Sequence, residues 1–198
     1  GISADDLWVA TAGTLNRWRG AGWAGSLPTP VALGNVKAVH GSGPDDVWIV
    51  GASGVARLDG ESWDVADLPP WCFNEGLDDI QLASPGNPWI VGRGSYLDGD
   101  VGRETVDVSF RKDGGWTCTR DDQEFPDSSP VRVAACDDET WIATRRGLWR
   151  ATASILRREA VNAAPNALAC RSGMGVWAVG SGGHIVHRPA VSSASGAR

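Results

Sequence analysis

The sequence has few of several residue types that most folded chains use freely. Its 198 residues contain one methionine, one tyrosine and three phenylalanines, and its two lysines are Lys37 and Lys112. Basic residues number 18 against 24 acidic ones, which gives a formal net charge of −6. A duplex-binding protein usually carries a basic stripe that neutralises phosphates. We therefore expect no nucleic-acid partner.

Long apolar runs and short catalytic motifs are also absent. No stretch reaches the roughly 18 apolar residues of a membrane span, and the first six residues do not resemble a secretory signal. The sequence contains no nucleophile elbow, no phosphate loop and no dinucleotide-binding glycine loop. These absences predict a mature, truncated or cytosolic chain with no membrane span, no cofactor and no catalytic activity.

Tryptophan, by contrast, is abundant, with 11 copies in the chain. Five of them anchor similar segments at spacings of 40, 41, 52 and 36 residues: Trp8, Trp48, Trp89, Trp141 and Trp177. A period near 40 residues is the size of one four-stranded propeller blade. Three of the anchors are followed nine residues later by an arginine: Arg17, Arg57 and Arg150. The sequence is therefore a repeat of one structural unit.

Each repeat predicts four antiparallel strands, which we name A to D in chain order. A stretch rich in small residues forms A, the anchor tryptophan lies on B, C ends near the arginine, and D opens with a second tryptophan. Asp59-Gly60 and Asp113-Gly114 predict tight turns between C and D, because such turns need positive φ. The acid pairs before the anchors predict A-to-B turns in which aspartate caps its own backbone: Asp5-Asp6, Asp45-Asp46 and Asp137-Asp138.

The signature Asp-Asp-Val-Trp-Ile-Val-Gly at 45–51, followed by Gly-Val-Ala-Arg-Leu-Asp-Gly-Glu-Ser-Trp at 54–63, resembles a known family. It is similar to Trp-rich β-propeller repeats of secreted proteins and lipoproteins common in myxobacteria and, more distantly, to Asp-box propellers. The resemblance implies an all-β propeller of about five four-stranded antiparallel blades in one domain, residues 1–198. The repeats fall at about 1–35, 36–78, 79–130, 131–166 and 167–198.

The strand count leaves the closure of the propeller open. The first repeat has no A strand, and the last has A, B and C followed by a tail from Pro189 to Arg198 that is rich in serine and alanine. Unpaired sheet edges invite association. Three interpretations follow: a five-bladed ring that closes imperfectly, a piece of a longer propeller, or a fragment completed by another chain. Self-association and a larger parent chain are accordingly both expected possibilities.

Four cysteines are present, none in a C-x-x-C pair. An even count at wide spacing favours two disulfides in an oxidising compartment, and four cysteines allow three connectivities. Cys136 and Cys170 fall at the outgoing ends of A strands in adjacent repeats, which favours their pairing and leaves Cys72 with Cys118. The alternative is four buried thiols in a cytosolic protein. The prediction is a secreted or cell-surface protein, with a cytoplasmic one as the alternative.

Irregular loops on the scaffold supply the candidate binding residues. The repeats lengthen at Pro69–Asp78, at Asp121–Pro130 and around Gly94–Glu104. Trp71 and Phe73 in the first passage, and Tyr96 in the last, predict ligand contact, as does His40 near the expected channel mouth. Asp98, Asp100 and Glu104 alternate around a glycine in a pattern that can wrap Ca²⁺, with a plain polar hairpin tip as the other interpretation.

Together these features predict a non-catalytic extracellular or cell-surface module that binds a protein or a glycan through loops on one propeller face. One alternative is an assembly subunit whose incomplete terminal blades pair with other chains. The other is a glycan-active hydrolase or lyase, because carboxylates are plentiful although no pair of them stands out.

Overall fold

The computed structural model of the chain describes residues 5–11, 13–121, 132–136, 139–152, 156–159 and 165–190. Three features discussed above fall wholly or mostly outside these residues. They are the passage from Asp121 to Pro130, the acid pair Asp137-Asp138, and the tail from residue 191 onward.

The described chain folds into five antiparallel sheets that follow one another in sequence order, and each is one blade. Blade 1 contains β1 (Asp6–Thr11), β2 (Thr14–Arg19) and β3 (Gly22–Pro28). Blade 2 contains β4 (Val36–Gly43), β5 (Asp46–Gly51), β6 (Val55–Leu58) and β7 (Trp63–Val65). Blade 3 contains β8 (Gly76–Ser84), β9 (Asn87–Asp98), β10 (Val101–Lys112) and β11 (Gly115–Asp121).

Blade 4 contains β12 (Arg132–Cys136), β13 (Glu139–Thr144), β14 (Gly147–Ala151) and β15 (Leu156–Glu159). Blade 5 contains β16 (Pro165–Arg171), β17 (Gly175–Gly180) and β18 (Ile185–Arg188). Two short 3₁₀ turns lie at Val31–Leu33 and Ser181–Gly183. Within the described residues the first and last blades thus have three strands, and the three middle blades have four.

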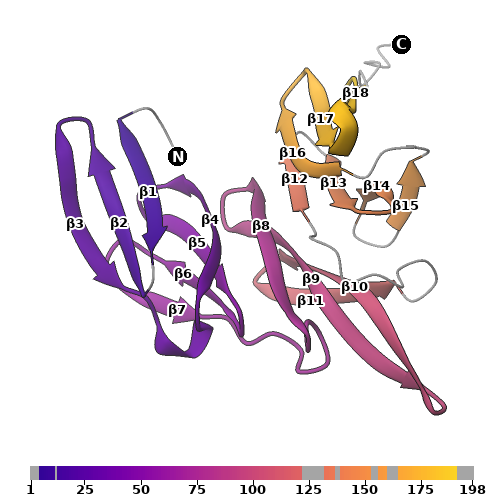
Figure 1. Cartoon of the computed structure of the whole chain (residues 1–198). Helices are drawn as coiled ribbons and strands as arrows, with labels where there is room; N and C mark the ends of the chain where they lie inside the picture. The colour runs from indigo at the N-terminus through magenta and orange to yellow at the C-terminus, as the bar shows by residue number, and fades with distance from the viewer. Residues whose placement is uncertain are drawn as a thin grey trace, which may run out of the picture.

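The blades are arranged in an arc around their inner strands. Extensive contacts between sheets join only consecutive blades, chiefly through neighbouring pairs of the inner strands β4, β8, β12 and β16. Figure 1 shows the five sheets following one another, with blade 1 and blade 5 at the two ends. The all-β prediction is confirmed, and the predicted count of blades agrees approximately.

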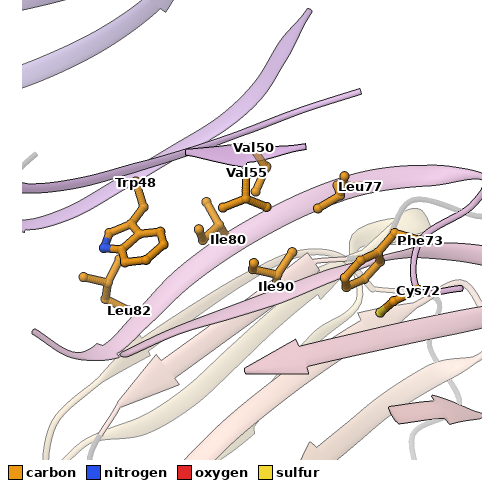
Figure 2. Close-up of a cluster of buried hydrophobic side chains, with 9 residues drawn as sticks. All are labelled: Trp48, Val50, Val55, Cys72, Phe73, Leu77, Ile80, Leu82 and Ile90. Carbon is orange, nitrogen blue, oxygen red and sulfur yellow. The ribbon is translucent and has the colours of Figure 1, made fainter. Parts of the chain in front are cut away.

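The hydrophobic core of the described chain consists of four clusters, one at each junction between consecutive blades. Strand β5 is buried along its whole length because both of its faces are covered. Val47 and Ile49 join the cluster shared with blade 1. Trp48 and Val50 point the other way, into the cluster shared with blade 3 (Figure 2). Alternation along a strand, with period two, therefore places side chains in two different junctions.

The turn chemistry agrees with the sequence where a two-residue hairpin is formed. Strands β10 and β11 pair with Lys112 opposite Gly115, so Asp113 and Gly114 form the loop. Both loop residues have positive φ, 52° and 82°. These are the dihedral signs of the turn that best matches the twist of the flanking strands.

The second acid of the first two pairs, Asp6 and Asp46, binds the repeated arginine of its blade, a role that the capping prediction did not include. Arg17 Nε and Nη2 donate to the two carboxylate oxygens of Asp6 at 2.8 and 2.6 Å. Arg57 Nε donates to Asp46 at 3.0 Å. In blade 4, an Arg150–Glu139 ion pair of 3.2 Å replaces the aspartate pair. The guanidinium of Arg17 also lies 4.8 Å from the Trp8 ring centre.

Both predicted disulfides are present. Cys136, the last residue of β12, is bonded to Cys170 in β16, with Cα atoms 5.6 Å apart. Cys72 is bonded to Cys118 in β11, with Cα atoms 6.4 Å apart. The first bond joins blades 4 and 5, and the second holds the long passage before β8 against blade 3. Two disulfides indicate an oxidising environment. Among the described residues, no helix is long and apolar enough to cross a bilayer.

Candidate functional site

Two of the three lengthened passages, Pro69–Asp78 and Gly94–Glu104, meet on blade 3. The segment leading into β8 carries Asn74, whose side-chain amide donates to the Ser95 carbonyl at 3.0 Å and accepts from the Ser95 N–H at 2.7 Å. Ser95 Oγ also donates to Glu75 at 2.7 Å. Ser95 belongs to the hairpin formed by β9 and β10. The loop before β8 and this hairpin therefore form one continuous surface, although about twenty residues separate them in the chain.

A buried ion pair anchors this surface. The Asp107 carboxylate, fully buried in β10, accepts from Arg120 Nε at 2.9 Å and Nη2 at 3.0 Å. It also accepts from the Thr105 hydroxyl at 2.9 Å and from the Phe73 N–H at 2.7 Å. The hydrogen bond to Asp107 raises the pKa of Arg120, which stays charged. Arg120 donates in turn to the Trp71 carbonyl and lies 5.5 Å from the Trp71 ring centre.

Glycine at position 94 makes this ion pair possible. A Cβ atom at Gly94 would lie 2.4 Å from Asp107 Oδ2 and 2.7 Å from an Arg120 nitrogen. Any other residue would push the pair apart. Strand β9 therefore forms one arm of the long hairpin. Through Gly94 its backbone also lies close to the Asp107–Arg120 pair at the base of that hairpin.

Trp71 and Phe73 were both predicted to bind ligand, but the structure separates them. Trp71 is 48% exposed and covers Arg120 with one face. Phe73 is 6% exposed and packs in the cluster between blades 2 and 3. Phe73 is therefore part of the hydrophobic core. Of the two aromatic residues, only Trp71 has a surface that a ligand can contact.

A second group of charged residues lies at the starts of the inner strands. Lys37 Nζ in β4 lies 3.3 Å from Asp78 Oδ1 in β8, and Arg93 Nε in β9 lies 3.1 Å from Asp78 Oδ2. Asp79, the next residue, accepts from the Val133 N–H of β12 at 3.1 Å. Two adjacent aspartates thus face partners on opposite sides of blade 3.

Successive side chains of a strand point to opposite faces, and β8 also has a bulge at this position. The pairing of β8 with β9 shifts between Leu77 and Asp79, so Asp78 is the extra residue. A bulge leaves one residue out of the ladder and redirects the side chains around it. The sequence contains three other Asp-Asp pairs near anchors, and Asp78-Asp79 differs because it lies within an inner strand.

Asp79 has the altered acidity of a group suited to proton transfer. Burial raises the pKa of its carboxyl, while the N–H groups of Val133 and Ile80 act in the opposite direction. Arg132, at the start of β12, also stabilises the charged form. A carboxyl whose pKa is raised binds a proton more tightly than an ordinary one, which makes its ionised form a stronger base. This is the only such raised carboxyl resolved in the described part of the chain.

His40 joins two blades and was predicted instead to face a ligand. Its Nδ1 accepts from the Leu82 N–H of β8 at 3.2 Å, and its Nε2 lies 2.8 Å from the Gln81 amide. Burial lowers the pKa of His40. A neutral ring that accepts at Nδ1 carries its proton on Nε2, the nitrogen that faces the Gln81 side chain. Both ring nitrogens are therefore occupied by protein partners.

The remaining predicted residues lie on the β9–β10 hairpin. Tyr96 is half-buried and pairs across the ladder with Arg103. Asp98 forms an exposed ion pair with the same Arg103 at 3.2 Å. Asp100 and Glu104 are exposed, and the described residues contain no group of three or more metal-type ligands placed to hold an ion. The calcium site at Asp98, Asp100 and Glu104 stays a prediction without support from the geometry.

Sequence comparisons identify no relative. No family model matches the chain, and no curated protein matches it. Structural comparison does find solved structures. The structure of a streptogramin B lyase superposes with a TM-score of 0.61 at 20% identity, over 94% of this chain and 66% of that one. This chain has a propeller fold. It spans just under two thirds of the length of the solved lyase chain.

A second solved structure is a catalytically inactive histidine-to-alanine variant of virginiamycin B lyase from Staphylococcus aureus with quinupristin. It shares 15% identity over 93% of this chain and 77% of that chain, with a TM-score of 0.48. The narrower resemblance to Trp-rich repeat proteins of myxobacteria finds no match in these comparisons.

The first of these structures corrects the predicted function. The sequence predicted a non-catalytic binding module and no enzyme, whereas the solved structure that superposes with a TM-score of 0.61 is that of a lyase. The lyase alternative agrees with it better. The absence of nucleophile and cofactor motifs does not exclude a lyase, because elimination requires neither.

Proposed function

We propose that this chain is a lyase of propeller fold, or the larger part of one. The observation that carries the proposal is its similarity to a streptogramin B lyase over 94% of its length, at a TM-score of 0.61. No observation favours a glycan over other substrates. The substrate class to test first is therefore the streptogramin B antibiotics, after which the solved enzyme is named.

The charged group at the starts of β4, β8 and β12 is the proposed reaction centre. A lyase removes a proton from carbon, forms a double bond, and releases a leaving group that departs with the bonding electron pair. Asp79 would accept the proton, because its buried carboxyl has a raised pKa. Arg132, which already stabilises the charged form of Asp79, would stabilise the negative charge that develops, while Lys37 and Arg93, which Asp78 holds on the opposite side of blade 3, would bind another part of the substrate.

Trp71 and the β9–β10 hairpin would contact the substrate beside this centre. Trp71 is exposed and its ring is fixed by Arg120. A rigid aromatic side chain offers a large contact area at small entropic cost. The supporting loop is bound to blade 3 through Cys72 and Asn74, so the platform is preorganised.

The test is incubation of the chain with a streptogramin B antibiotic, followed by mass spectrometry of the product. Elimination within a ring gives a product of unchanged mass, whereas hydrolysis adds one water. We expect a product whose mass equals that of the antibiotic. We also expect Asp79→Asn to lower kcat/KM about a hundredfold or more. Lys37→Ala serves as a second variant at a partly exposed position.

Asp113→Asn is the matched control, because Asp113 is an exposed carboxylate in the β10–β11 turn of the same blade. It should leave kcat/KM unchanged. A product that gains water, or no product from the wild-type chain, contradicts the lyase proposal. Wild-type activity that survives Asp79→Asn and Lys37→Ala contradicts only the proposed site.

The location of the protein is also a proposal. We infer secretion or display at the cell surface, because both disulfides persist only where thiols are oxidised.

A further inference from the structure

Arg111 departs from the pattern that the neighbouring blades follow. In blades 2 and 4 the residue opposite the beginning of the fourth strand is apolar and buried: Leu58 and Ala151. In blade 3 the residue at this position is Arg111, which pairs with Trp116 in β11. A cation therefore stands where the other four-stranded blades have an apolar side chain.

The side chain of Arg111 lies against an indole ring and has no ionic partner. Its guanidinium carbon is 5.5 Å from the Trp48 ring centre, and its buried Nε has no hydrogen-bond partner. No carboxylate of the described chain forms an ion pair with it. Four arginines elsewhere in the fold do form such pairs: Arg17, Arg57, Arg120 and Arg150. The Arg111 guanidinium thus retains its capacity to bind a carboxylate through two parallel hydrogen bonds.

Arg111 lines a pocket of about 570 Å³ at the junction between blades 2 and 3. Trp48 and Trp116 line it too, with their rings edge to face and their centres 5.9 Å apart. The other wall is formed by residues 64–70, which end blade 2 and lead toward β8. Pockets for small molecules have volumes of about 300–1,000 Å³ and combine aromatic surface with a few polar groups. This pocket has both properties.

The corresponding space at the next junction is nearly filled. There Phe110 of blade 3 stacks on the anchor Trp89 with ring centres 4.8 Å apart. The cavity beside these two rings measures about 10 Å³, and Thr152 and Leu156 line it from blade 4. A space of that size holds at most one water molecule. The wide pocket is therefore a feature of the junction that contains Arg111, and the repeat by itself does not produce it.

We propose that this pocket binds a small molecule that carries one carboxylate on an aromatic or aliphatic body. Arg111 would hold the carboxylate through two hydrogen bonds. The body of the ligand would lie against Trp116, Leu68 and Pro69, which line the pocket around Arg111. The site goes beyond the proposed lyase activity, because none of the described residues that line it belongs to the proposed reaction centre.

The charges around the pocket favour a carboxylate over a phosphate. Two exposed acids, Asp64 and Asp67, line the pocket together with the single cation Arg111. A doubly charged phosphate would be repelled by both acids more strongly than a singly charged carboxylate. The lining therefore selects a ligand with one negative charge.

The first measurement is calorimetric titration of the wild-type chain with phenylacetate, which has one carboxylate on an aromatic ring. We expect saturable binding. Phenylacetamide has the same shape without the charge, and it should bind about tenfold more weakly or worse, because it loses the charge-assisted hydrogen bonds to Arg111.

Arg111→Leu gives blade 3 the residue that blade 2 has at this position. The variant should fold and unfold at no lower temperature than wild type, because it removes a buried N–H that has no acceptor. Its affinity for phenylacetate should fall about tenfold or more. Arg111→Lys keeps the charge without the planar fork, so its affinity should lie between the two. Arg103→Leu is the matched control, because Arg103 is an exposed arginine on the β9–β10 hairpin outside the pocket.

A wild-type chain that shows no saturable binding of phenylacetate at millimolar concentrations overturns the proposal. So does equal affinity for phenylacetate and phenylacetamide, tighter binding of phenyl phosphate, or an affinity that Arg111→Leu leaves unchanged. These measurements use no antibiotic and alter no residue of the proposed reaction centre. Ligand binding can therefore fail while lyase activity is retained, and the reverse.

Discussion

Asp107 shows how much a single residue can determine at the candidate site. Its carboxylate has no solvent contact and receives hydrogen bonds from Arg120, Thr105 and the backbone of Phe73. Through these bonds it fixes both the loop that carries Trp71 and the base of the long hairpin. The sequence did not predict this role, because the acid and the arginine lie thirteen residues apart on strands whose register was unknown.

Replacement of Asp107 should therefore be severe. Asp107→Ala leaves the Arg120 guanidinium without its partner and the Phe73 N–H unsatisfied, and we expect a loss of about 3–5 kcal/mol in the free energy of unfolding. Denaturant titration measures the loss. The exposed pair of Asp98 and Arg103 is the control, and Asp98→Ala should cost less than about 1 kcal/mol. Equal losses in the two variants would contradict the role assigned to Asp107.

Asp79 should make stability depend on pH in the direction opposite to that of a salt-bridged acid. Burial raises its pKa in the folded state above the ordinary value near 3.8, so the folded chain binds this proton more tightly than the unfolded chain. The contribution of Asp79 to stability is thus full below the unfolded pKa and is lost as the pH rises through the folded pKa.

The measurement is the free energy of unfolding of wild type and Asp79→Asn as a function of pH. The difference, variant minus wild type, should increase as the pH rises from about 3.8 and become constant above the folded pKa of Asp79. A difference that falls with rising pH would contradict the raised pKa.

At the scale of the element, the hairpins and disulfides follow closely from the sequence. The Asp113-Gly114 turn and the Cys136–Cys170 pairing required only local turn rules and the expected order of strands. The function of the repeated acids did not follow. The nine-residue offset of Arg17 from Trp8 was visible, but its cause is a cross-strand ion pair with Asp6, which becomes apparent only once the ladder is known.

The bond between β12 and β16 should stabilise the end of the arc. Replacing Cys136 and Cys170 together by serine removes a crosslink that spans 34 residues, and we expect a loss of about 2–5 kcal/mol in the free energy of unfolding. Thermal unfolding of variant and wild type without reductant gives the difference. In the presence of reductant, the variant and the wild type should unfold at the same temperature, because the bond is then absent from both. A double variant as stable as wild type would show that this bond does not constrain the fold.

At the scale of the molecule, the repeat predicted the architecture and the wrong kind of function. The periodic tryptophans pack between blades, so their spacing predicts the fold. It carries no information about the chemistry of a site. The candidate centre is built differently, from Lys37, Asp78 and Arg93 on three strands. A residue that occurs once in five repeats has no periodic signal, so repeat analysis passes over it.

The regular orientation of the anchor tryptophans has a consequence for how such a molecule changes over evolutionary time. Because the anchor tryptophans Trp8, Trp48 and Trp141 pack toward the next blade, whereas Val47 and Ile49 beside Trp48 pack toward the blade before, the series of blades has a direction. Duplication of a gene segment that encodes a whole blade would keep this direction of packing, whereas loss of blade 4 or blade 5 would leave one cysteine of the Cys136–Cys170 bond without its partner. Selection can alter the number of blades independently of the chemistry held by a single one.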